Sequence, residues 1–482
     1  MLWLGHVSTV TQSQQHALAQ VGANRQPPST DGAAERARVL CLLRRFGCNA
    51  TSFQALEPGF RYFFDGDDGV VAYVQTAGAW VAAGEPIAPE PRLKAVAERF
   101  VMAARAAGRR ALFFATEPRF AGMPGFDAVL IGEQPVCHPA EWDGALRKSR
   151  SLREQLRRAR AKGVRVRLVQ ACEIAGPDAP LRRSLERLIA SWLHSRSMAP
   201  MGFLVHVAPF DFVKERRVFV AETDDGVCGM LALVPVYARG GWFLEDLVRA
   251  PFAPNGTTEL LVDSAMRCAA AEGCSYLTLG LAPLAGEVGR WLRTARAVGR
   301  GLYDFSGLRA FKAKFRPATW MPIYLSLPHG RSSHVAIYDS LAAFAQGGLL
   351  RFGLASLLRG PAIVVRALTL ALLPWTVALA ALDSARYFPA PWVKWAWVVF
   401  DAGLAAALFA LTRRFRPALA RALSYVITGD AVLTAVEAAT FNLPRARSTA
   451  EVITAAVAVA APTLAAVVLR NAWKRRVLAS HP

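Results

Sequence analysis

The 482-residue sequence lacks the residue patterns that usually mark a metal centre or a disulfide-stapled fold. Its seven cysteines are scattered, with no Cys-x-x-Cys pair and no clustering with histidine, which argues against a zinc site and a disulfide framework. The eight histidines are dispersed too; His194 and His206 flank a loop without a triad pattern. We therefore expect reduced thiols, as in the cytoplasm, no metal and no cofactor.

Acidic residues are scarce relative to basic ones. The chain has 36 Asp and Glu against 57 Lys and Arg, a net charge of +21. This excess favours a polyanionic partner, either nucleic acid or an anionic lipid surface, although cytoplasmic loops of membrane proteins also gather basic residues. Because residues 1–32 show neither the apolar core of a signal peptide nor apolar periodicity, we expect no signal peptide there and expect these residues to be disordered.

Long hydrophobic runs are rare before residue 361 and frequent after it. Four segments each approach the ~20 residues that cross a bilayer: 361–382, 392–411, 418–440 and 450–469. The third carries Arg421, Asp430 and Glu437, so it either spans or lies along the interface. Basic clusters before the first, between the second and third, and after the fourth fall on one side, which the positive-inside rule makes cytoplasmic. We expect a membrane region of about four helices over 361–482, in a multi-pass protein of the bacterial inner (cytoplasmic) membrane whose catalytic region faces the cytoplasm.

The residues before this region alternate between helical and strand patterns and predict two α/β units, 33–139 and 140–328, followed by a linker, 329–360. The first unit has helical spacing over 34–47 and 91–108 and strand patterns over 60–64, 69–76 and 110–115. The second has helices over 144–162, 180–195 and 257–272 and strands over 217–223, 227–237, 241–249 and 275–281. Hairpin, strand, helix and strand in this order match the core of an acetyltransferase-like (GNAT-type) fold. Two tandem units of this α/β fold are the simplest architecture.

The junction between the strand at 241–249 and the helix at 257–272 is the strongest candidate for a site. The strand ends in Asp246 and Arg249, and the helix begins near Thr257. In acetyltransferase-like folds the acyl donor lies at this junction, where N–H groups of the helix N-terminus face an anion. Enzymes that use acyl-CoA commonly have a Gly-rich run there, whereas this chain has Ala-Pro-Asn-Gly. An ordinary loop with a helix cap at Thr257 is the alternative interpretation.

Three stretches of sequence, EDLVRAPFAPNGTTELL, YLTLGLAPLAG and YDFSGLRAFKAKFRPATWMPIYLSLP, follow one another in this order. They resemble the catalytic domain of the aminoacyl-phosphatidylglycerol synthases, the lysyl- and alanyl-phosphatidylglycerol transferases of the multiple peptide resistance factor family, over roughly residues 36–328. The resemblance implies a tandem acetyltransferase-like fold and an aminoacyltransferase that takes its aminoacyl group from aminoacyl-tRNA. It implies a phosphatidylglycerol headgroup hydroxyl, or that of a related lipid, as acceptor, and a link to antimicrobial peptide resistance. The best-known members place a large flippase region before this domain; here a smaller apolar tail follows it, so we expect synthesis and anchoring only.

Carried onto this chain, the family motifs assign catalytic roles to four residues: Asp246, Arg249, Glu259 and Lys314. We also expect substrate binding by Lys312, the close neighbour of Lys314, and by the loop residues Asn255 and Gly256. An acid, either Asp246 or Glu259, would take the proton of the lipid hydroxyl or bind the donor's amino group, and the two roles stay open between them. Arg249 and Lys314 would stabilise an oxyanion or bind phosphates. Alternatively, Glu259 could have only a structural role, as an acidic residue that the positive end of the helix dipole stabilises.

The helix expected at 144–162 is strongly basic. We interpret Arg150, Arg153 and Arg157 as contacts for the tRNA acceptor arm or for anionic headgroups. A solvated helix face is the alternative. Donor binding that weakens steeply with salt would support the contact.

Two rival functions stay open. One is an N-acyltransferase that uses acyl-CoA or an acyl carrier to make an amino-acid-containing lipid, whose product would survive ribonuclease treatment. The other is a non-catalytic, membrane-bound module that binds tRNA or lipid. The sequence leaves the transferred amino acid, the exact acceptor and the oligomeric state undetermined.

Overall fold

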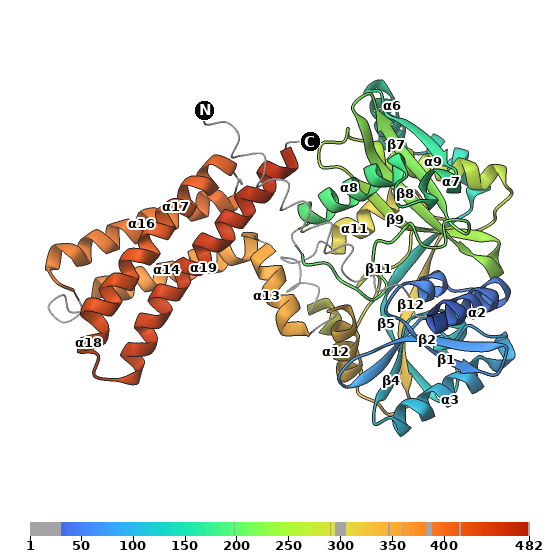
Figure 1. Cartoon of the computed structure of the whole chain (residues 1–482), viewed down its shortest axis with the longest axis horizontal. Helices are drawn as coiled ribbons and strands as arrows, with labels where there is room; N and C mark the ends of the chain where they lie inside the picture. Colours follow the sequence, from blue (N-terminus) through green and yellow to red (C-terminus); the bar gives the residue numbers. More distant parts are fainter. Residues whose placement is uncertain are drawn as a thin grey trace. The chain divides into compact units, whose positions relative to one another are not determined.

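The computed structural model describes residues 30–196, 198–289, 291–294, 305–345, 348–359, 361–381, 388–413 and 416–480. The chain divides into an α/β unit, which ends near Leu349, and a helical unit, which consists mainly of the residues from Leu350 onward (Figure 1). Most of the segment 1–32, expected to be disordered, lies outside the described residues. Its last residues, from Thr30, already belong to the first described helix.

Among the described residues, the α/β unit is built on one mixed sheet of 12 strands. Its first strands are β1 (Arg61–Asp65), β2 (Gly69–Gln75), β3 (Ala79–Ala83), β4 (Arg110–Thr116) and β5 (Phe126–Cys137). The later ones are β6 (Arg165–Val169), β7 (Arg217–Thr223), β8 (Gly226–Val236), β9 (Gly241–Arg249), β10 (Leu277–Thr278), β11 (Ala282–Pro283) and β12 (Thr319–Pro328). The helical elements are α2 (Thr30–Phe46), η1 (Ser52–Leu56), α3 (Leu93–Ala106), α4 (Pro118–Ala121), α5 (Trp142–Arg147), α6 (Arg150–Ala161), α7 (Ala171–Ala175), α8 (Pro180–Ser195), α9 (Thr257–Ala271), α11 (Phe305–Ala313) and α12 (Ser333–Phe344).

The same arrangement of elements occurs twice in this unit. In the first half, antiparallel strands β1, β2 and β3 are followed by α3 and by β4, which runs parallel to β3. In the second half, antiparallel strands β7, β8 and β9 are followed by α9 and by β10, parallel to β9. This repeat confirms the predicted fold class, two acetyltransferase-like units in tandem.

The two halves exchange strands, which joins them into a single sheet. β5 of the first half pairs antiparallel with β10 of the second half. β12, the last strand, inserts between β4 and β5 and pairs antiparallel with both. The boundary expected between residues 139 and 140 falls directly after β5, and it stays a prediction because the exchange leaves no gap in the sheet.

Each half has its own hydrophobic core, and these cores fix the helices that follow β3 and β9. Phe100 of α3 packs with Phe113 and Phe120, all fully buried. Leu261 and Met266 of α9 are fully buried against β7 to β9. Each side chain of this size contributes roughly 1.5–3 kcal/mol when buried. The core of the second half therefore holds both β9 and α9 in place on either side of their junction.

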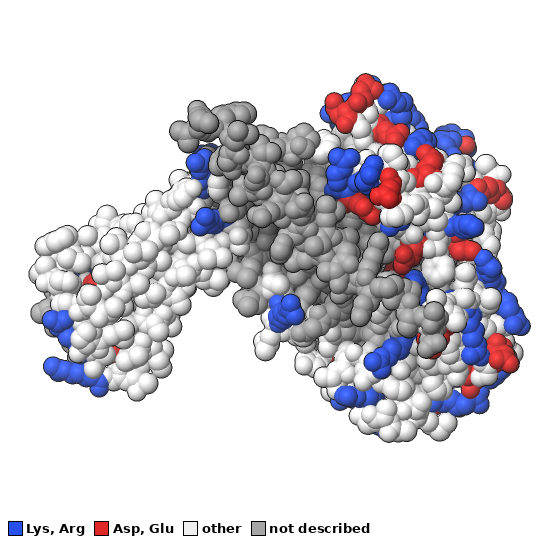
Figure 2. Space-filling view, viewed as in Figure 1, with Lys and Arg blue, Asp and Glu red and all other residues white. Residues whose placement is uncertain are grey.

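The helical unit contains α14 (Pro361–Ala381), α16 (Pro391–Arg413), α17 (Pro417–Glu437) and α19 (Thr449–Ser480). In the described residues, 3 stretches are long and apolar enough to cross a membrane: Pro391–Leu411, Pro417–Arg445 and Thr449–Asn471. The third expected span lies in the second of these stretches, and the first expected span matches a shorter apolar helix, Val365–Ala381. Figure 2 shows few charged side chains on the visible face of this unit, whereas the α/β unit carries many. The segment 329–360, expected to be a linker, contains α12 and α13 (Leu349–Arg359).

Candidate active site

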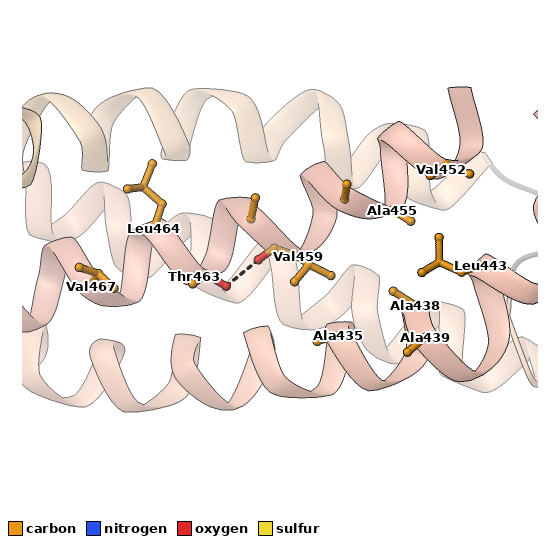
Figure 3. A pocket seen from close by; sticks show the side chains of 12 residues that line it. Ala435, Ala438, Ala439, Leu443, Val452, Ala455, Val459, Thr463, Leu464 and Val467 are labelled. Carbon is orange, nitrogen blue, oxygen red and sulfur yellow. Dashed lines mark hydrogen bonds between the residues drawn. The ribbon is translucent and has the colours of Figure 1, made fainter. Parts of the chain in front are cut away.

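A groove of about 750 Å³ runs along α17 and α19 in the helical unit (Figure 3). Its lining is apolar except for one hydroxyl, that of Thr463, which donates a hydrogen bond to the carbonyl of Val459 at 2.7 Å. Acid–base or nucleophilic chemistry needs ionisable groups, and this groove offers none. The candidate site therefore lies in the α/β unit.

The two parallel strands of the second half separate where the sequence motif begins. β9 pairs with β10 only at Trp242 and Phe243. β10 ends at Thr278, and the chain leaves the sheet at Gly280, whose φ of 72° is left-handed. Within the described chain, β9 from Leu244 to Arg249 therefore has no strand partner on this edge. Such an opening at the carboxyl ends of parallel strands is where α/β sheets bind ligands.

The loop between β9 and α9 requires glycine at position 256. Gly256 has a φ of 93°, and a Cβ atom there would lie 2.2 Å from the carbonyl oxygen of Gln155 on α6. Because only glycine tolerates both constraints, α6 can pack closely against the start of α9. Gly256 is buried, while its neighbour Asn255 is exposed. Their predicted roles in substrate binding stay predictions, but Gly256 already has a structural one.

The structure brings Glu259 and Lys314 together at the start of α9. The Lys314 ammonium lies 3.5 Å from Glu259 Oε1, and the Glu259 side chain is only 7% exposed, against 41% for Lys314. The Thr258 hydroxyl donates to Glu259 Oε2 at 2.8 Å. Glu259 lies in the first turn of α9, where the helix dipole also stabilises a carboxylate. A partly exposed cation beside a buried carboxylate has the chemical groups needed for proton transfer and oxyanion stabilisation.

Lys312 lies on α11 at the other side of the strand opening. Its buried amine donates to the carbonyl oxygens of Gly280 and Leu281, each at 2.8 Å. Burial lowers the pKa of Lys312 to about 7. The two hydrogen bonds hold the amine at this point of the chain. Lys312 thus fixes the point where β10 leaves the sheet, while Lys314, two residues later, reaches α9; its predicted role in substrate binding stays a prediction.

Asp246 and Arg249 point to opposite faces of β9. Arg249 lies opposite Gly229 of β8, and Asp246 lies opposite Ala232, in unbroken register. A Cβ atom on Gly229 would meet Leu261 and Thr257 of α9 at 3.1 Å, so Arg249 projects toward the α9 face and Asp246 away from it. The Arg249 side chain makes no hydrogen bond or ion pair with another described residue. The structure does not bring Asp246 into contact with Glu259 or Lys314.

Asp246 belongs instead to a buried acidic cluster that we define as Glu57, Glu245 and Asp246. The register between β8 and β9 shifts after Ala232, which leaves Glu245 as an extra residue in a β-bulge; bulges re-aim neighbouring side chains and are common beside active sites. Arg216 forms an ion pair with Glu245, and both side chains are 2% exposed. Burial raises the pKa of Asp246 and of Glu57 well above their ordinary values, and the neighbouring carboxylates raise them further.

Sequence reasoning missed Glu57, Arg216 and Glu245. Glu245 adjoins Asp246 in the motif, and this adjacency was a usable signal. Glu57 follows η1 in the first half, nearly two hundred positions away, and no local pattern connects it to β9. Only the packing of the two halves brings it to the cluster.

The predicted basic helix at 144–162 is broken into α5 and α6. Ser149 caps α6, because its hydroxyl accepts from the backbone N–H of Leu152 at 3.4 Å, so the prediction of one continuous helix was wrong. Arg150, Arg153 and Arg157 are all exposed. Arg157 contacts Glu154 at 2.8 Å, but exposed ion pairs are worth at most about 1 kcal/mol. Arg157 could therefore leave Glu154 and bind a phosphate at little cost in free energy.

Comparisons with known proteins identify the family to which the chain belongs. The model of the family described as "Phosphatidylglycerol lysyltransferase, C-terminal" matches residues 41–326. A phosphatidylglycerol lysyltransferase from Bacillus subtilis is 25% identical over 322 residues, which are 63% of this chain and 36% of that protein. The bifunctional protein LysX for lysylphosphatidylglycerol biosynthesis from Mycobacterium marinum is 27% identical over 214 residues, 42% of this chain and 19% of that protein. The chain thus spans about a third or less of these relatives.

Two solved structures have the same fold. The L-PGS structure from Bacillus licheniformis superposes with a TM-score of 0.56 at 21% identity, covering 66% of this chain and 97% of that one. A C-terminal domain of the lysylphosphatidylglycerol synthetase type from Agrobacterium fabrum gives 0.57 at 24% identity, covering 66% and 99%. Because the family model matches more than half of its residues, this chain belongs to the family of phosphatidylglycerol lysyltransferase C-terminal domains.

Proposed function

We propose that this protein transfers an aminoacyl group from aminoacyl-tRNA to the headgroup hydroxyl of phosphatidylglycerol or a related membrane lipid. The family match over residues 41–326 is the observation that carries the proposal. The matched residues contain the ion pair of Glu259 and Lys314 and the segment of β9 that has no partner strand on one edge. The exposed arginines of α6 supply a surface for the anionic tRNA or headgroup.

The reaction exchanges one ester for another. The lipid hydroxyl oxygen attacks the ester carbonyl carbon, a new C–O bond forms, and the bond to the terminal ribose oxygen of the tRNA breaks. The hydroxyl proton leaves to a base and returns to the ribose oxygen. We assign the base to Glu259, because its carboxyl group lies in the first turn of α9 beside the partly exposed ammonium of Lys314.

Asp246 is less suited to act as the base. It is buried on the face of β9 that points away from α9, where burial and the neighbouring Glu245 raise its pKa. Lys314 is placed to stabilise the negative charge that develops on the carbonyl oxygen. Arg249, on the α9 face of the strand end, is suited to bind a phosphate of the donor or of the lipid.

We further propose that the helical unit holds the enzyme in the bacterial cytoplasmic membrane, with the α/β unit in the cytoplasm. Three apolar stretches of membrane-spanning length support this location. The basic clusters of the sequence support the orientation through the positive-inside rule.

Lipid mass spectrometry tests the proposal. Cells that express the chain should contain an aminoacylated lipid that is missing from cells without it and from cells with Lys314→Met. The mass of this lipid names the amino acid and the acceptor. Unchanged lipids in all three strains would contradict the proposal and favour a non-catalytic binding module. A product that persists in ribonuclease-treated extracts would favour an acyl-CoA or acyl-carrier donor.

A further inference from the structure

The outward side of α12 is apolar, although a helix on the surface of a protein normally presents polar residues to water. Val335, Tyr338 and Leu341 are 41%, 59% and 53% exposed. Residues three apart are neighbours on a helix surface, so these three side chains form one patch, which we define as the α12 face. Exposed apolar patches commonly mark binding surfaces. The α12 face therefore points to a partner that covers it.

The inward side of α12 fixes this orientation. Ala336 and Ala343 are buried in the core between α12 and the sheet, together with Leu325 of β12. The buried carboxylate of Asp339 accepts two hydrogen bonds from the guanidinium of Arg110 at the start of β4, each at 2.7 Å. Bidentate pairs of this kind set the geometry as well as the energy of a contact. The α12 face thus cannot turn toward the sheet without breaking this pair.

The charges near the α12 face suit an anionic partner. From residue 331 to residue 360 the chain has three arginines and a single acid, Asp339, which is buried in the ion pair just described. Arg331, directly before α12, is exposed. At the start of α12 the ring of Trp291 lies 4.7 Å from the ring of His334. Apolar side chains with arginine, tryptophan and tyrosine beside them are typical of protein surfaces that contact membrane headgroups.

The chain after α12 is short enough to keep this face near a membrane. Residues 345–360 separate α12 from Pro361, where the apolar helix α14 begins. α13 accounts for 11 of them and is about 16 Å long, and the other residues extend at most about 18 Å. The family match ends at residue 326, so α12 belongs to the same extension as the apolar helices.

A second copy of the chain fits the α12 face less well than a membrane does. Three side chains that are about half exposed offer roughly a few hundred Å² at most. A stable protein interface needs about 800 Å² from each partner. A bilayer has no such requirement, because its headgroup region accepts single apolar side chains to a depth of about 5–10 Å.

We propose that the α12 face lies on an anionic membrane surface and holds the α/β unit against the bilayer. Val335 and Leu341 enter the headgroup region, where Tyr338 keeps its hydroxyl in water, and Arg331 attracts the anionic headgroups. This contact is additional to the apolar helices that anchor the chain. It goes beyond the proposed function, since docking needs no aminoacyl transfer.

Photo-crosslinking of the full-length protein identifies what covers the α12 face. A photoreactive p-benzoylphenylalanine replaces either Tyr338 or the control Met102, which lies on α3 against the other face of the sheet and is also 59% exposed. Each protein is irradiated in nanodiscs of phosphatidylglycerol mixed with phosphatidylcholine, or of phosphatidylcholine alone. Mass spectrometry identifies the attached molecule, and thermal unfolding confirms that each variant is folded.

We expect lipid attached at position 338 in roughly tenfold or greater excess over position 102. Removing the anionic lipid should lower this yield about fivefold for each arginine at the surface. Arg331→Glu should lower the yield in the mixed nanodiscs and leave it unchanged in phosphatidylcholine alone.

Equal lipid attachment at positions 338 and 102 would overturn the inference, as would a peptide of the helical unit or of a second copy in place of lipid at position 338. Equal yields in the two kinds of nanodisc would overturn the anionic surface as the partner. Lipid attachment at position 338 in a protein that makes no aminoacylated lipid would support the inference and contradict the proposed function. Aminoacyl transfer without lipid attachment at position 338 would do the reverse.

Discussion

Replacing Lys314 with methionine separates the chemical role of its ion pair from its contribution to stability. Lys314 is 41% exposed and lies 3.5 Å from Glu259, so solvent screening limits the contribution of the pair to folding to about 1 kcal/mol. Loss of a group that stabilises the oxyanion costs far more in the transition state, about 10²- to 10³-fold in kcat, or roughly 2.7–4 kcal/mol. We therefore expect Lys314→Met to fold nearly as stably as wild type and to lose at least a hundredfold in transfer.

Lys94→Met provides the matched control. Lys94 pairs with Glu98 on α3 at 3.8 Å, and both side chains are about half exposed. The assay measures the rate at which labelled amino acid moves from charged tRNA into extractable lipid, alongside thermal unfolding of each variant. If the two residues act as a unit in catalysis, as we propose, Glu259→Gln combined with Lys314→Met should be little worse than either single change. Normal transfer by Lys314→Met, or a loss that only parallels its unfolding, would refute the role.

Three further outcomes follow from the geometry. Gly256→Ala should destabilise the protein by at least 1–2 kcal/mol, measured by unfolding, because of its left-handed φ and the carbonyl of Gln155 2.2 Å from the new Cβ; an unchanged melting temperature would contradict the packing. Charge reversal at Arg150 and Arg153 should weaken donor binding and flatten its salt dependence; unchanged slopes would exclude these residues from the interface. Lys312 has a pKa of about 7 when folded and about 10.4 when unfolded, so its burial destabilises the fold fully below pH 7 and progressively less up to pH 10. The stability of wild type relative to Lys312→Met should therefore rise between pH 7 and 10, and a constant difference would count against a buried neutral amine.

The sequence predicted the elements whose signals are local. β8 and β9 have strong apolar patterns bounded by turns, and α9 has helical spacing after a Pro-Asn-Gly break, so all three were predicted to within one or two residues. β5 and β12 were missed. Gly132 and Pro135 interrupt β5, and Pro322 interrupts β12, although proline is usually excluded from a central strand. Both strands owe their formation to pairing across about 190 residues of sequence, which no local pattern reveals.

The candidate site was partly visible in the sequence. The motif order suggested that Glu259 and Lys314 belong to one site, and the structure places them in contact, although their roles in catalysis stay predictions. Placing Asp246 beside them was not supported, because the unbroken register puts Asp246 and Arg249 on opposite faces of β9. The packing of η1 against β8 brings Glu57 into electrostatic interaction with Asp246, so this proximity depends on tertiary packing alone.

A reconstituted transfer reaction tests the central claim most directly. The purified full-length protein is mixed with phosphatidylglycerol vesicles and tRNA charged with a labelled amino acid, with and without prior ribonuclease treatment. We predict that label enters the chloroform-extractable lipid, that ribonuclease abolishes this transfer, and that Lys314→Met reduces it at least a hundredfold. Label that never enters lipid with any charged tRNA, or that enters it equally after ribonuclease, would contradict aminoacyl transfer at the opening between β9 and β10.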